Sequence, residues 1–147
     1  MSQSIVKSRQ FWPGRCFAGR IPLGSDLFDA LSSFCLEKDI ACALFRLAGN
    51  LSLASCGCLD QFQQVYVSRR AEGWLELGSG TAFVSVADKR ADVVVHASFT
   101  DAEGATLSGR LFPPTTVHAV EFMAREYTGE MLRRAYDANT GLELWDL

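Results

Sequence analysis

The stretch that decides the fold is VVVHASFTDAEGATLSGRL, residues 93–111. Two strand-like segments, Val93–Phe99 and Ala105–Leu111, flank the short polar sequence Asp101-Ala102-Glu103-Gly104. Polar turn residues between two such segments predict a β-hairpin. We therefore expect antiparallel β-structure in this part of the chain.

Further strands are expected on both sides of this hairpin, because apolar segments of strand length alternate with turn signals. They are Arg15–Ile21, Ile40–Leu47, a hairpin of Leu51–Leu59 and Phe62–Val67 around Asp60-Gln61, Trp74–Leu77, Ala82–Val86 and Thr115–Arg125. Between them, Gly49-Asn50 and residues 87–90 predict turns, Gly78-Ser79-Gly80 predicts a bulge, and Pro113-Pro114 is expected to end a strand.

One helix is expected early in the chain. Leu27, Leu31 and Cys35 recur at the spacing of one helix face, and Ser25 is placed to be the N-cap, with Asp26 in the first turn and the end near Lys38. One helix among seven or more strands predicts an α+β fold, in which the helix covers one face of a largely antiparallel sheet.

Composition limits the function classes. The 147 residues suffice for one domain, expected at residues 13–147 after a flexible lead-in of residues 1–12. A net charge of −3 and a pI of about 5.3 argue against a domain that holds nucleic acid by bulk charge. No apolar segment is long enough for a membrane helix and no signal peptide is evident, so we expect a cytoplasmic protein without a membrane partner.

No catalytic or cofactor motif stands out. The five cysteines lack the paired spacing of a zinc site, so we expect packing thiols and neither metal nor cofactor. Ser98, His96 and Asp101 could be drawn as a triad, but no nucleophile elbow surrounds them. The chain is accordingly expected not to be an enzyme.

The ordered series of motifs resembles a known family. A strand leading into Gly78-Ser79-Gly80 precedes a strand ending in His96-Ala97-Ser98-Phe99-Thr100-Asp101, then Glu103-Gly104, Ser108-Gly109-Arg110-Leu111 and a return strand with Glu121. This series, over roughly residues 13–145, resembles the plant-and-prokaryote-conserved (PPC) domain of "putative DNA-binding proteins". The resemblance implies a central, largely antiparallel sheet and assembly as a homotrimer.

In plant members of this family, the DNA contact comes mainly from a separate AT-hook with a Gly-Arg-Pro core. This chain contains no such segment, so any DNA contact must come from other basic residues. The candidates are Arg69, Arg70, Lys89, Arg90, Arg133 and Arg134, and solvated turns are the simpler interpretation of each pair. A trimer would triplicate these groups, so weak DNA binding stays open.

Many prokaryotic members resemble one another in three histidines suited to a metal. At the matching positions this chain has Val94, His96 and Arg110, and a guanidinium has no lone pair for a metal, so the resemblance implies a lost metal site. His96, Arg110 and Glu121 remain candidates for a small-anion pocket, with an internal Arg110–Glu121 ion pair as the alternative. By strand alternation His118 faces away from Glu121, and we expect it to lie outside the site.

Overall fold

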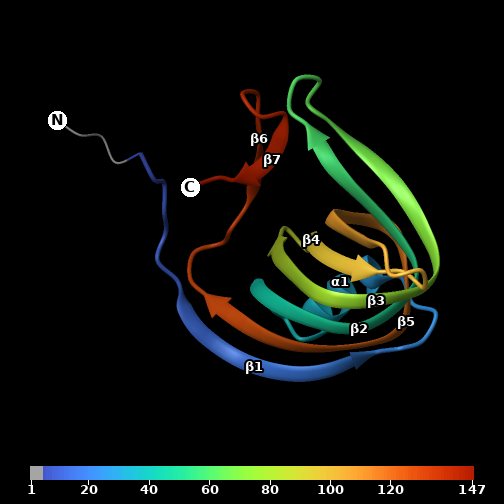
Figure 1. The fold of residues 1–147 in the computed structure, drawn as a ribbon. Helices are drawn as coiled ribbons and strands as arrows, with labels where there is room; N and C mark the ends of the chain where they lie inside the picture. The colour runs from blue at the N-terminus through green and yellow to red at the C-terminus, as the bar shows by residue number, and fades with distance from the viewer. Residues whose placement is uncertain (1–4) are drawn as a thin grey trace.

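The computed structural model describes residues 5–147, and it confirms the expected α+β class. Within this range the chain forms seven strands and one helix (Figure 1). In chain order the elements are β1 (Trp12–Ile21), α1 (Leu27–Glu37), β2 (Cys42–Asp60), β3 (Val65–Ala87), β4 (Arg90–Thr100), β5 (Thr106–Thr128), β6 (Arg134–Asp137) and β7 (Leu142–Trp145).

The main sheet is antiparallel throughout and curls back on itself. Its order is β1-β5-β2-β3-β4, and the first part of β5 also pairs with β4. The long strand β5 can pair with both β1 and β4 because different segments of it face each of them. Figure 1 shows the resulting strong curvature, with α1 inside the curve and the small β6–β7 hairpin beside the tip of the β2–β3 hairpin.

Two predicted breaks, at Gly49-Asn50 and at Pro113-Pro114, are wrong, because β2 and β5 run through them. At Gly49 the φ angle is +131°, and an added Cβ would lie 1.9 Å from the carbonyl oxygen of Ala119 on β5. This glycine therefore serves close approach of two strands and not a turn. The expected bulge at Gly78 is present as a register shift between Leu77 and Ser79.

The helix begins one residue later than expected. Asp26, and not Ser25, is the N-cap, and its Oδ1 accepts hydrogen bonds from the backbone N–H groups of Phe28 and Asp29 at 2.9 and 3.1 Å. Its Oδ2 accepts from the backbone N–H of Thr115 on β5 at 2.9 Å. One carboxylate thus caps α1 and ties it to the sheet.

The apolar core fills the inside of the curve. Leu27, Leu31 and Cys35 of α1 are fully buried. Phe34 of the same helix meets Phe45 of β2 edge-to-face at 5.9 Å between ring centroids. The single helix is therefore enough to cover the concave face of the sheet.

The β2–β3 hairpin extends beyond this core. Its turn lies at residues 61–64, so Phe62 belongs to the turn and not to the predicted strand, and its side chain is fully exposed. Gln64 Nε2 donates to the carbonyl oxygen of Asn139 at 3.1 Å, which joins the hairpin tip to the β6–β7 turn. The hairpin tip and β6–β7 thereby come together beside β4 and β5.

Candidate functional site

The pairing of β4 with β5 places two of the three predicted pocket residues side by side. His96 and Arg110 are direct cross-strand partners. Glu121 lies farther along β5, where its partners are Arg20 and Ala48, and it forms no ion pair with Arg110 among residues 5–147. Of the proposed pocket, only the His96–Arg110 pair is brought together.

Arg110 is held by aromatic rings. Its guanidinium carbon lies 5.2 Å from the ring centroid of Tyr66 and 5.3 Å from that of Phe112. These rings pack edge-to-face on each other, and Arg110 Nη1 lies 3.5 Å from the Tyr66 hydroxyl oxygen. Cation–π contact with two rings holds the guanidinium in place while leaving donors free for a ligand.

A cavity of about 560 Å³ joins Arg110 to three of the basic residues singled out in the sequence. Arg90 is the first residue of β4, Arg134 is the first residue of β6, and Arg133 directly precedes it. This grouping was not predicted, because Arg110 and the basic pairs lie on segments whose proximity depends on how β6–β7 folds back. Two of these four arginines lie within ion-pair distance of a carboxylate, and two do not.

Arg90 and Arg133 are the two arginines that lie within ion-pair distance of a carboxylate. Arg133 forms an ion pair with Asp88 through both Nη atoms, and Arg90 Nε lies 4.0 Å from Asp92 Oδ1. The Arg133 guanidinium lowers the pKa of the Asp88 carboxyl by hydrogen bonding and by its charge. Each of these two arginines therefore has a nearby carboxylate that reduces the positive charge it presents to the cavity.

The other two, Arg110 and Arg134, have no carboxylate partner within ion-pair distance in the described part of the chain. Arg134 lies 5.3 Å above the Trp145 ring, and its Nη1 donates to the carbonyl oxygen of Glu143 at 3.0 Å. Its Nε and the Trp145 Nε1 are buried and find no acceptor among residues 5–147. Buried donors without acceptors are costly.

The pKa values of Arg134 and His96 reflect their burial and their closeness to Arg110. Burial lowers the pKa of the Arg134 guanidinium, and the charge of Arg110 adds to the effect, although Asp92 and Glu143 oppose it. Burial also lowers the pKa of His96, as does the neighbouring Arg110. Four arginines and three carboxylates, Asp88, Asp92 and Glu143, therefore line this cavity, and positive charge exceeds negative charge by one.

The remaining basic candidates do not line this cavity. Lys89 occupies the tight β3–β4 turn, where Asp88 and Lys89 both have positive φ, and its side chain is exposed. Arg69 and Arg70 are exposed on the projecting part of β3, on opposite sides of the strand by alternation. The six candidates therefore do not form one continuous patch.

Comparison with known families settles the wider relationship. The model of the Plants and Prokaryotes Conserved (PCC) domain, written PPC above, matches residues 9–128. The chain belongs to this family. No match was found among curated protein sequences.

Solved PPC-like structures have the same fold as this chain. A metal-containing protein from Archaeoglobus fulgidus is 31% identical over 95% of this chain and 99% of its own, with a TM-score of 0.88. A PPC protein from Pyrococcus horikoshii is 27% identical over 97% and 98%, with a TM-score of 0.87. A "putative DNA binding protein" from Bacteroides thetaiotaomicron is 17% identical over 94% and 98%, with a TM-score of 0.78, and shows the fold alone.

At the three positions compared in the sequence, the residues of this PPC domain do not fit a metal ion. Val94 has no donor atom, and the Arg110 guanidinium is stacked on Tyr66 and Phe112 without a lone pair to offer. Only His96 could ligate, and no group of three potential ligands is found in residues 5–147. The same place in the fold carries positive charge instead.

Two further findings bear on partners. Among residues 5–147 no helix is long and apolar enough to cross a bilayer. Several large apolar side chains, among them Trp12, Phe62 and Met123, are more than half exposed. Such side chains mark an interface with another chain where they form one contiguous patch.

Proposed function

We propose that this PPC protein is a non-enzymatic binding protein, and that its ligand is a small oxyanion held between Arg110 and Arg134. One observation carries the proposal: these two guanidinium groups line the same cavity and lack carboxylate partners in the described structure. Each is oriented by an aromatic ring, so little side-chain entropy would be lost on binding.

The chemistry of the cavity is that of phosphate or carboxylate recognition. Guanidinium groups donate paired hydrogen bonds to such anions, and hydrogen bonds to charged groups contribute about 1.5–3 kcal/mol each. Val93 and Val94 add an apolar wall on β4. A compact anion with an apolar part would use both features.

Isothermal titration with inorganic phosphate and with citrate tests this proposal. The intact protein should bind one of them, and Arg134→Gln should weaken binding about tenfold or more. Arg69→Gln is the matched control, because it removes one exposed arginine outside the cavity and should leave affinity unchanged. Equal losses in the two variants, or no binding of either anion, would contradict the proposal.

Duplex DNA is the rival ligand, since two proteins of similar structure, from Bacteroides thetaiotaomicron and Ralstonia eutropha, are each described as a "putative DNA-binding protein". Anisotropy of a labelled random duplex at low and near-physiological salt distinguishes the two. Because two basic candidates lie beside carboxylates and Arg69 and Arg70 lie apart from the cavity, we expect little binding. Salt-sensitive binding that Arg69→Gln and Arg70→Gln weaken would favour DNA.

We further propose that the protein acts as a homotrimer. The support is the family membership, which carried this expectation, together with the exposed apolar side chains of Trp12, Phe62 and Met123. Light scattering during size exclusion should give about three times the chain mass of 16.1 kDa. A mass equal to one chain at micromolar concentration would contradict trimer formation.

A further inference from the structure

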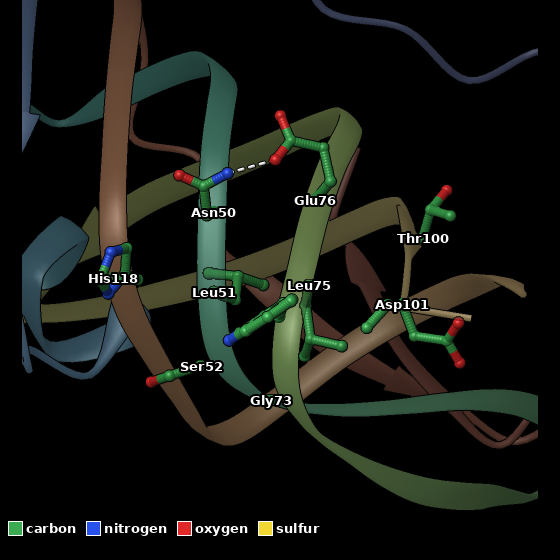
Figure 2. Close-up of a pocket in the computed structure, with 11 residues that line it drawn as sticks. Asn50, Leu51, Ser52, Gly73, Leu75, Glu76, Thr100, Asp101 and His118 are labelled. Atoms are coloured by element: carbon green, nitrogen blue, oxygen red, sulfur yellow. Dashed lines mark hydrogen bonds between the residues drawn. The ribbon is translucent and has the colours of Figure 1, made fainter. Parts of the chain in front are cut away.

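A second cavity, of about 740 Å³, opens where the pairing of β2 with β3 and with β5 shifts register at neighbouring positions. Between Leu51 and Leu53 of β2, the register shifts against both β3 and β5. Figure 2 shows the result: side chains from β2, β3, β5 and the end of β4 surround one hollow. This cavity shares no lining residue with the arginine cavity.

The irregularities are β-bulges that redirect two side chains. On β3, Gly73 and Trp74 lie opposite the single residue Ser52, and on β5 His118 has no partner in the register. Gly73 has φ +110° with nothing within 4 Å of an added Cβ, so glycine is needed for backbone conformation and not for space. Bulges are frequent beside binding sites because they re-aim side chains.

Trp74 and His118 are the two redirected residues, and both line the cavity. The Trp74 side chain is 84% exposed, which is unusual for the largest apolar side chain. By strand alternation, His118 was expected to face away from Glu121 and to lie outside the predicted pocket. The bulge at His118 interrupts that alternation. Leu51 and Leu75, both buried, supply the apolar floor.

The polar groups of this cavity are mainly acceptors. Asn50 Nδ2 donates to Glu76 across β2 and β3, as Figure 2 shows, which leaves the second Glu76 oxygen and Asn50 Oδ1 free to accept. Asp101 Oδ1 accepts from two backbone N–H groups of its own turn, and its Oδ2 has no partner among residues 5–147. No lysine or arginine lines the cavity, and neither carboxylate forms an ion pair in the described residues.

From this combination we infer that the cavity binds an organic ammonium ion with an apolar body. The exposed indole face of Trp74 attracts a cation through its quadrupole. Glu76 supplies an acceptor for the N–H donors, and Leu51 and Leu75 receive the apolar part. A neutral apolar ligand would cover the Glu76 carboxylate without pairing it, which costs free energy.

Binding of n-butylammonium tests this inference, with butan-1-ol as the uncharged probe of the same size. The three tryptophan indole N–H resonances are followed in ¹⁵N-correlated spectra. Saturable shifts of the Trp74 resonance are expected with butylammonium in the millimolar range, and at least tenfold weaker binding with butan-1-ol. Equal shifts with both probes would overturn the assignment of a cation site.

Glu76→Gln removes the charge but keeps an oxygen that can accept from Asn50. It should weaken butylammonium binding about tenfold or more. Glu72→Gln is the matched control, because Glu72 is exposed on the same strand outside the cavity. Trp74→Leu, followed by saturation transfer to the probe, should also abolish binding. Wild-type affinity in Glu76→Gln would contradict the inference, whatever the outcome for oxyanions at Arg134.

Discussion

Removal of the Asp26 carboxylate should destabilise the protein at two places at once. In Asp26→Ala, helix α1 loses its N-cap, which costs about 1 kcal/mol. The backbone N–H of the fully buried Thr115 also loses its acceptor, which costs a further ~1–3 kcal/mol. The total of about 3 kcal/mol corresponds to a drop of roughly 6–12 °C in melting temperature for a chain of this size.

Two companion variants isolate the two contributions. Asp26→Ser keeps a capping oxygen but cannot reach Thr115 as well, so it should lose only the second contribution, about 2 kcal/mol. Ser25→Ala should change stability by less than about 0.5 kcal/mol, because the Ser25 hydroxyl makes no contact that caps the helix. Thermal and urea unfolding at one fixed protein concentration measures all three variants. A larger loss in Ser25→Ala than in Asp26→Ala would refute the assignment of Asp26 as the cap.

Three further predictions concern the packing of the sheet. Phe45→Ala should cost about 3–5 kcal/mol in urea unfolding, since this side chain is fully buried among other rings; a loss below about 1 kcal/mol would contradict the assigned core. Gly49→Ala should cost more than about 1 kcal/mol, because it requires a strained φ and a clash with Ala119, and an unchanged urea midpoint would disprove the close approach. Hydrogen bonds from Arg15 lower the pKa of Glu126, so this carboxylate stabilises the fold above its unfolded pKa near 4.5 and loses that effect as the pH falls. The stability deficit of Glu126→Gln at pH 7 should therefore shrink in acid-unfolding experiments below pH 4.5, and a deficit that grows there would refute the sign.

Local sequence patterns predicted the element types well, since the periods of apolar residues depend on neighbours along the chain. The helix at Leu27–Glu37 and the hairpin of β4 and β5 follow from spacing and turn chemistry alone. The breaks predicted at Gly49 and Pro113 were wrong because glycine and proline also occur inside long, curved strands. Whether a glycine marks a turn or a close approach depends on a strand that lies distant in sequence.

The candidate site was predictable only in part, for a similar reason. The pairing of His96 with Arg110 follows from the hairpin register, which the sequence indicates. Arg134 lines the same cavity as Arg110 only because β6–β7 folds back toward the main sheet. The position of Trp145 beside Arg134 depends on the same fold-back. Glu121 was grouped with Arg110 from strand order, but register places it beside Arg20.

The most direct test of the oxyanion site uses the indole N–H of Trp145, which is buried beside Arg134 and lacks an acceptor in the described structure. During titration with phosphate or citrate, its ¹⁵N-correlated resonance should move and saturate, while those of Trp12 and Trp74 stay in place. The shift should disappear in Arg110→Gln. A stationary Trp145 signal at anion concentrations that saturate binding would contradict the assignment of this cavity as the ligand site.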